Sequence, residues 1–168
     1  MRRKIEAGTD DEGMLALTVL QPFATAIVST DPRAKRSENR SWRRDWPAGG
    51  TWIAIHAGAR PYPVKGPDGW VALLDGLWSR TGWDAWRPPG VPLGQPIYPR
   101  SALLGVARFV GCVPVDERPG DLWAVGPFCH VIAEVRPLSA PILGVKGALG
   151  FWRVPDEHLA PLRALVAA

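Results

Sequence analysis

Thr51-Trp-Ile-Ala-Ile-His56 is the clearest β-strand in the sequence. Side chains alternate across a strand, so Ile53 and Ile55 share one face while Trp52 and His56 share the other. We therefore expect the isoleucine face to point into a core.

Apolar runs on both sides of this segment predict further strands. Residues 15–20 are expected to form the first one. Gln21-Pro22 then opens a short helix that reaches about Val28, with Pro22 at the first helical position, where its missing N–H is tolerated. Residues 101–115, 128–136 and 151–154 are also rich in strand-forming side chains.

One amphipathic helix is predicted between Asp68 and Arg80. Its apolar residues recur at helical spacing, which indicates a buried stripe, with Asp68 available as the cap. We expect Trp70 and Trp78 to belong to that stripe. A second, short helix is predicted over residues 161–166.

These elements indicate an α+β fold in which a small, highly bent sheet or barrel is flanked by two to three helices. The 18 glycines and 18 prolines among 168 residues favour short strands and many turns over long helices. Residues 1–13 are expected to form a mobile tail, and residues 14–168 a single domain.

Composition narrows the class of protein. Hydrophobic residues make up 46% and charged residues 21%, which argues against a disordered chain. Neither a secretory signal nor an apolar run of membrane-spanning length is evident, and Cys112 and Cys129 lie in apolar runs as reduced thiols would. We therefore expect a cytoplasmic protein without a membrane partner. No metal-ligand spacing is found, and no metal or cofactor is expected.

The charge is concentrated in one segment, residues 33–44. Six cations stand there against the single Glu38, a sum of +5, while the whole chain carries +4 and the remainder therefore −1. Such concentration is typical of a surface that faces a polyanion, although a solvated charge run gives the same pattern. Polar alternation up to Trp42 favours an exposed or groove-lining strand here.

Four motifs in order resemble those of the ASCH family, the activating signal cointegrator homology domains of the PUA-like superfamily. They are Gln21-Pro22-Phe23 after the first strand, the signature residues Lys35, Glu38 and Arg40, the strand that ends in His56-Ala57, and a late Gly147, Gly150 and Trp152. The resemblance spans residues 14–154. Arg33 stands where the family signature has glycine, so the turn before Lys35 is expected to differ.

The resemblance implies a PUA-like β-barrel whose signature residues point into a cleft that binds RNA or DNA, and in some members hydrolyses RNA or acylated nucleosides. Geometry adds a condition. Because Lys35 and Glu38 are three apart, they share one site only if Lys35 lies in the turn before the strand, which leaves Glu38 and Arg40 on one face with Trp42.

Our first functional hypothesis is a module that binds single-stranded RNA through a basic cleft with stacking aromatic residues. Phosphates would contact four arginines: Arg33, Arg36, Arg43 and Arg44. The ligand-binding residues would be Gln21, Pro22, Phe23, Lys35, Glu38, Arg40, Trp42, His56 and Trp152. A nucleoside-like small molecule is the other possible ligand of this cleft, and the oligomeric state stays open.

A hydrolase acting on RNA or acylated nucleosides is the alternative. Glu38 would activate water as a general base and Lys35 would stabilise an oxyanion. The related amidohydrolases carry a hydroxyl residue three positions after the lysine, whereas this chain carries Glu38 there. A third hypothesis, an adaptor for protein partners, rests on the proline-rich residues 81–100.

Overall fold

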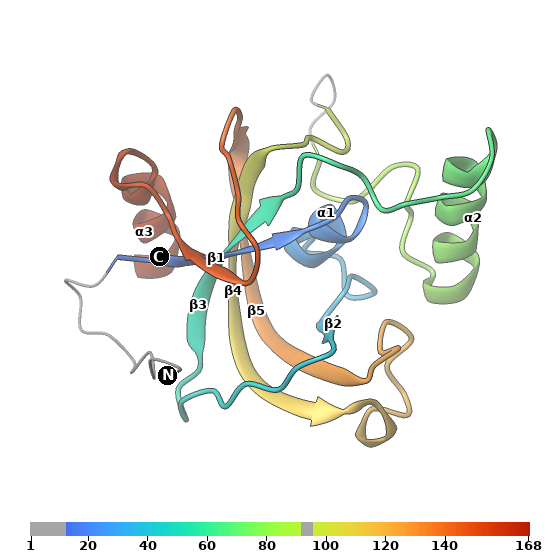
Figure 1. The fold of residues 1–168 in the computed structure, drawn as a ribbon, viewed down its shortest axis with the longest axis horizontal. Helices are drawn as coiled ribbons and strands as arrows, with labels where there is room; N and C mark the ends of the chain where they lie inside the picture. Colours follow the sequence, from blue (N-terminus) through green and yellow to red (C-terminus); the bar gives the residue numbers. More distant parts are fainter. Residues whose placement is uncertain (1–12, 92–95) are drawn as a thin grey trace.

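The computed structural model of the chain describes residues 13–91 and 96–168. Six strands form a single sheet in the order β2-β5-β4-β3-β1-β6, and Figure 1 shows it curled into a half-barrel. The expected mobile tail, apart from Gly13, lies outside the described residues. Across those residues, no helix has the length and apolar character needed to cross a membrane.

The strands follow the sequence-based expectation closely. β1 (Leu15–Val19) pairs in parallel with β3 (Thr51–Ala57), and the other neighbours are antiparallel. β2 (Ser37–Arg40) and β6 (Phe151–Arg153) are short edge strands. β4 (Ala102–Pro114) and β5 (Phe128–Ile142) are long, and register shifts along their pairing bend them. The α+β architecture with a strongly bent sheet is therefore confirmed.

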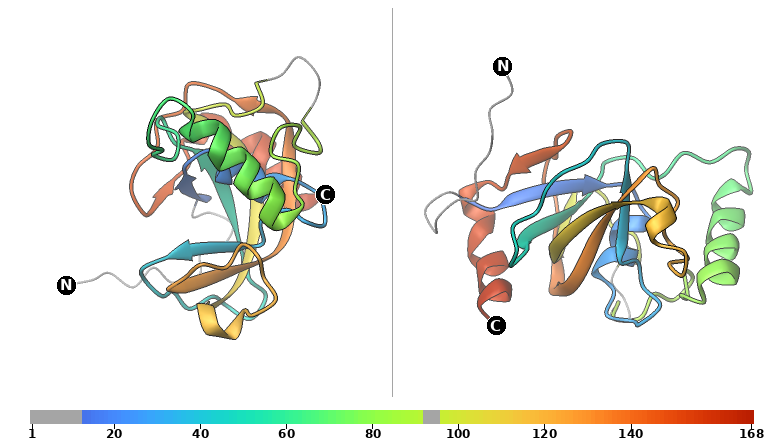
Figure 2. Two further views of the ribbon diagram at one scale, coloured as in Figure 1. Left: turned by 90° about the vertical axis from the view of Figure 1, so that its right-hand side faces the viewer. Right: turned by 90° about the horizontal axis from the view of Figure 1, so that it is seen from below.

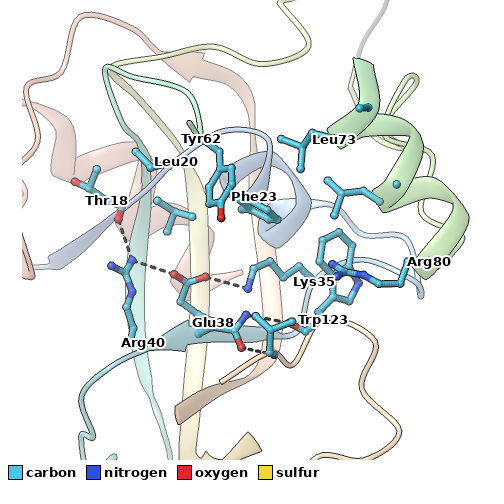
Figure 3. A pocket seen from close by; sticks show the side chains of 16 residues that line it. Thr18, Leu20, Phe23, Lys35, Glu38, Arg40, Tyr62, Leu73, Arg80 and Trp123 are labelled. Carbon is cyan, nitrogen blue, oxygen red and sulfur yellow. Dashed lines mark hydrogen bonds and ion pairs between the residues drawn. The ribbon is translucent and has the colours of Figure 1, made fainter. Parts of the chain in front are cut away.

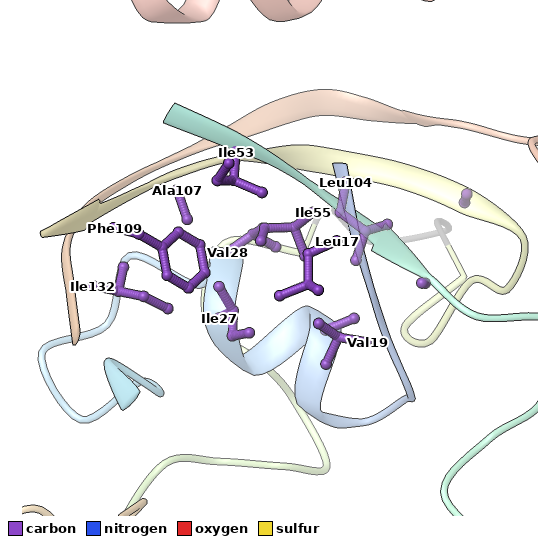
Figure 4. Packing of buried hydrophobic residues seen from close by; sticks show 13 residues of the cluster. Leu17, Val19, Ile27, Val28, Ile53, Ile55, Leu104, Ala107, Phe109 and Ile132 are labelled. Atoms are coloured by element: carbon purple, nitrogen blue, oxygen red, sulfur yellow. The ribbon is translucent and has the colours of Figure 1, made fainter. Parts of the chain in front are cut away.

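Helix α1 (Phe23–Val28) fills the inside of the curl. Its Ile27 and Val28 pack against Leu17, Ile55 and Phe109 of the sheet, as Figure 4 shows. Pro22 is the cap that precedes this helix and not its first residue, a shift of one position from the expectation. Because α1 enters the curl from β1, it brings the turn that precedes it to the open end of the half-barrel.

The outer face of the sheet is also covered. Helix α3 (Leu159–Ala167) follows the 3-10 turn Asp156–His158 and packs Leu159 and Leu162 against Ala54 and Val106. The expectation that only the isoleucine face of β3 meets a core is therefore incomplete. A single alanine in the strand gives no strong apolar signal, so the sequence of β3 did not indicate this second core.

Helix α2 (Gly69–Thr81) lies at the opposite end of the molecule from α3, as both Figure 1 and Figure 2 show. It packs on loops through Leu74 and Leu77, which contact Trp83 and Trp123. The expectation that Trp78 is buried is wrong, since its exposed fraction is 49%. Loops cover a narrower stripe of a helix than a sheet does, and Trp78 falls outside it.

Candidate functional site

A cavity of about 660 Å³ opens where β2, the turn before α1 and helix α2 meet. We call it the Glu38 cavity. Figure 3 shows Lys35, Glu38 and Arg40 from the β2 side, with Phe23 and Tyr62 above them and Arg80 of α2 at one side. The cavity lies at the open end of the half-barrel, where the edge strand leaves space that α2 partly covers.

Three ionic side chains form the base of the Glu38 cavity. Lys35 Nζ and Arg40 Nη2 each lie 3.0 Å from a different carboxylate oxygen of Glu38. The side chains of Lys35 and Glu38 are almost fully buried, whereas that of Arg40 is partly exposed. Buried charges of this kind persist only when further hydrogen bonds satisfy them, and here Lys35 donates to the Ser37 carbonyl and Arg40 to the Thr18 carbonyl.

The local backbone explains why these three meet. Lys35 precedes the strand, as the three-residue spacing required, and its N–H donates to the Ala26 carbonyl of α1. Alternation along β2 then turns Ser37 and Asn39 toward the loop that follows β4, where Ser37 donates to Asp121 and the Asn39 amide bonds the Trp123 carbonyl and two backbone N–H groups. The intervening Glu38 is thereby held toward the cavity.

Trp42 does not share the face of Glu38 and Arg40. β2 ends at Arg40, so strand alternation does not extend to residue 42. Instead Trp42 packs edge to face against His130 and Phe151. Its carbonyl accepts a hydrogen bond from His130 Nε2.

Several lining residues were missed by sequence reasoning. Arg80 and Leu73 come from α2, Tyr62 from the loop before it, and Trp123 from the loop after β4. A signal existed for part of this set, because residues 73, 77 and 80 lie on one stripe of a helix. Nothing in the sequence indicated which other segment that stripe would face.

The expected phosphate-binding arginines lie apart from one another. Arg33 is exposed and paired with Asp31 at 3.0 Å, an interaction that lowers the pKa of that carboxyl. Arg36 donates to the carbonyls of Ile27, Ser29 and Lys35 and so caps the end of α1. Burial lowers the pKa of the Arg36 guanidinium. The basic segment therefore does not present its six cations on one surface.

Arg44 lies against a group of four contacting aromatic side chains. We call these five residues the Arg44 cluster: Trp42, Arg44, Trp46, His130 and Phe151. The Arg44 guanidinium carbon lies 4.6 Å from the ring centre of Phe151 and 4.9 Å from that of Trp46. Burial lowers the pKa of Arg44. Arg43 lies over Phe128 at 5.5 Å in a similar way. None of these side chains lines the Glu38 cavity.

His56 and Trp152 belong to one hydrogen-bonded chain behind the cavity wall. Trp152 Nε1 donates to Thr18 Oγ1 at 3.0 Å, that hydroxyl lies 3.1 Å from His56 Nδ1, and His56 Nε2 lies 2.7 Å from the Val145 carbonyl. A carbonyl only accepts, so His56 carries its proton on Nε2 and accepts from Thr18 on Nδ1. Burial lowers the pKa of His56, which fits this neutral form.

Position 147 must be glycine because the loop passes close to these hydrogen-bonded side chains. A Cβ on Gly147 would lie 2.6 Å from His56 ring atoms and from Thr18 Oγ1. The glycine of the late motif thus permits a close approach of the loop to a buried ring.

Gln21 and Pro22 also lie outside the cavity lining. Gln21 is fully buried, donates to the Pro99 carbonyl at 2.9 Å and accepts from the Thr25 N–H at 3.0 Å. It ties α1 to the proline-rich connection. Phe23, the third residue of that motif, does line the cavity.

The described parts of the proline-rich connection pack on the body of the protein. The Pro89 carbonyl accepts from Ser29, and Trp83 is fully buried, while Trp86 is 38% exposed. Residues 92–95 lie outside the described residues. Within residues 13–91 and 96–168, no three His, Cys, Asp or Glu side chains gather as a metal site requires.

No family model matches the sequence, and no curated protein matches it either. The ASCH resemblance therefore stays a prediction that rests on the four motifs. The structure brings the central signature residues Lys35, Glu38 and Arg40 together in one cavity. It places His56 and Trp152 behind the wall of that cavity.

Proposed function

We propose that the protein binds single-stranded RNA and takes one unpaired nucleotide into the Glu38 cavity. The proposal rests on one observation: the same cavity is lined by cationic side chains and by aromatic rings. The charged lining residues are Lys35, Arg40 and Arg80 against Glu38, three positive and one negative, which leaves a lining charge of +2. An anionic ligand is therefore favoured.

Arg80 is the cation best placed to meet a phosphate. Among the described residues, none of the ion pairs includes Arg80. Lys35 and Arg40, in contrast, share Glu38. A guanidinium with unused donors at the side of a cavity can bind a phosphate through two parallel hydrogen bonds.

The aromatic walls suit a base. The rings of Phe23 and Tyr62 meet edge to face with centres 5.2 Å apart, and Tyr62 is 43% exposed. An exposed ring beside a cationic pocket is the arrangement on which unpaired bases stack. The cavity volume of about 660 Å³ falls within the range of roughly 300 to 1,000 Å³ typical of pockets for ligands of this size.

Fluorescence anisotropy with labelled homo-oligomers of each of the four ribonucleotides tests the proposal. We expect affinity to fall with salt, with a slope near −0.7 for each phosphate neutralised. Tyr62→Leu should weaken binding by about 1 to 3 kcal/mol if a base stacks there. Arg163→Gln on α3, at the far end of the molecule, is the matched control for lost charge. If no oligomer binds at low salt, or Tyr62→Leu and Arg80→Gln both leave affinity unchanged, the proposal fails.

Hydrolysis of RNA or of an acylated nucleoside is a second candidate, favoured by the contact between Lys35 and Glu38 at the base of the same cavity. Glu38 would activate a water and Lys35 would stabilise the developing oxyanion. Both oxygens of Glu38 already accept from cations, an arrangement that serves binding better than proton abstraction. Chromatography of the oligomers and of N-acylated nucleosides after incubation decides this: the hydrolase is supported only if cleavage occurs and disappears in Glu38→Gln.

A further inference from the structure

A second cavity of about 550 Å³ lies against the first, and we call it the Arg118 cavity. Trp123 lines both. Three segments also line both cavities. In each segment, one residue lines the Glu38 cavity and a near neighbour lines the Arg118 cavity. These pairs are Lys35 and Arg36, Arg80 and Thr81, and Val125 and Leu122. The two cavities therefore lie on either side of a border formed by Trp123 and these three segments.

The Arg118 cavity also carries a positive lining. Arg33, Arg36 and Arg118 stand against Glu117 and Asp121, a lining charge of +1. The Arg36 guanidinium already donates hydrogen bonds to three backbone carbonyls. Arg118 binds Asp121 through Nη2 at 2.8 Å, and its side chain is 28% exposed, so part of the guanidinium remains accessible from the cavity.

Arg33 is available in a different way. Its side chain is 58% exposed, and its Nε and Nη2 each donate to the Asp31 carboxylate at 3.0 Å. This bidentate pair leaves Nη1 without a partner among the described residues, so a phosphate can contact that nitrogen. Leu122, which is 56% exposed, adds an apolar surface at the same rim.

We propose that the Arg118 cavity is a subsite for the nucleotide next to the one held in the Glu38 cavity. Arg33 and Arg118 contact the phosphate of this neighbour, and the RNA strand crosses the border formed by Trp123 and the end of α2. The inference rests on the proposed function and deepens it, because it gives the site a length of more than one nucleotide.

Isothermal titration with nucleoside 5′-monophosphates and with the matching 5′-phosphorylated trinucleotides tests this. We expect each trinucleotide to bind roughly tenfold more tightly than its mononucleotide, the gain of about one charge-assisted hydrogen bond. The salt dependence should be steeper for the trinucleotide by about 0.7 for each added phosphate contact. Equal affinities for the two lengths would overturn the subsite.

Some variants should lower trinucleotide affinity and one should raise it, which keeps the test independent of folding defects. Arg33→Gln and Arg118→Gln should lower trinucleotide affinity far more than mononucleotide affinity. Glu117→Gln removes a carboxylate from the lining and should raise trinucleotide affinity, a result that a misfolded protein cannot give. Arg163→Gln serves again as the charge control.

The outcomes separate the two levels of the proposal. A length gain that survives both Arg33→Gln and Arg118→Gln overturns the subsite and leaves the Glu38 cavity as a single-nucleotide site. Failure of the mononucleotides and trinucleotides alike to bind overturns the proposed function, and the subsite with it.

Discussion

The Glu38 cavity and the Arg44 cluster draw their cations from the same short segment but treat them differently. In the cavity, Lys35 and Arg40 share one carboxylate at the base and line the space that a ligand would enter. In the cluster, the Arg44 guanidinium lies against the rings of both Trp46 and Phe151, which contact each other edge to face. A ring face holds a cation without neutralising it, and Arg44 is half-buried there, so less of its guanidinium is open to a ligand. A local charge of +5 therefore overstates the charge that a polyanion can meet.

The largest effect should come from breaking the ionic group. Glu38→Gln leaves Lys35 and Arg40 without their anion, and because Lys35 is almost fully buried, we expect the free energy of unfolding to fall by about 3 kcal/mol. Urea denaturation followed by tryptophan fluorescence measures it. Glu157→Gln, on a side chain 77% exposed, is the matched control and should change stability little. A Glu38→Gln protein as stable as the wild type would show that the cations reach water instead.

Acid should weaken both regions through their histidines. His56 lies beside the cavity wall and His130 within the Arg44 cluster, and burial lowers the pKa of each below the ordinary 6.5. The unfolded chain therefore binds more protons than the folded one once the pH falls below about 6.5. Stability is lost from there downward, by up to about 1.4 kcal/mol per pH unit for each histidine.

Denaturation at pH 7 and pH 5 measures this dependence. That window excludes Asp31 and Asp121, whose lowered pKa values make them titrate only below the ordinary 3.8. His56→Gln and His130→Gln should each remove about half of the dependence. Equal stability at both pH values would contradict the neutral state assigned to His56 and the lowered pKa of His130.

Arg80→Gln should separate binding from stability. Arg80 is exposed and pairs with none of the described carboxylates, so its loss should leave the denaturation midpoint unchanged. RNA affinity should fall roughly tenfold, the value of a charge-assisted hydrogen bond of about 1.5 kcal/mol. Anisotropy and urea titration on the same preparation give both quantities. A loss of stability with unchanged affinity would show that Arg80 stabilises the fold and does not bind RNA.

Arg44→Ala should give the reverse result with the smallest magnitude. Removing the guanidinium from its place against two rings should destabilise the protein by about 1 kcal/mol. RNA affinity should stay unchanged at a temperature where the variant is folded. Arg44→Lys should recover part of the lost stability. If Arg44→Ala instead weakens RNA binding and leaves stability intact, the contrast between the two regions is wrong.

The sequence predicted the elements better than their surroundings. Period-two alternation identified β3, and the motif spacing correctly required Lys35 to precede the strand of Glu38 and Arg40. The same reasoning placed Trp42 on that face because it cannot detect that β2 ends at Arg40. It also could not foresee that Ala54 joins a second core with Leu159 and Leu162 of α3, since an alanine carries no directional signal.

Pairings between distant segments explain the rest. Asp31 pairs with Arg33, carbonyls at the end of α1 bind Arg36, and two rings, one of them in β6, hold Arg44. These partners decide whether each arginine is free. Arg80 enters the site only because α2 packs on loops at the open end of the sheet. Charge and periodicity describe a residue's own segment, whereas availability to a ligand is decided by the partner segment.

The way Asn39 fastens β2 bears on when the site comes into existence during folding. Its amide joins the strand to Trp123, 84 residues later, and β2 itself pairs with β5. Contacts of such sequence separation form late, because a long loop must close before they are rewarded. A chain in which these contacts have not formed lacks the cavity. A ligand that recognises only the finished site pulls the equilibrium toward the native state, so a rise in melting temperature reports on binding.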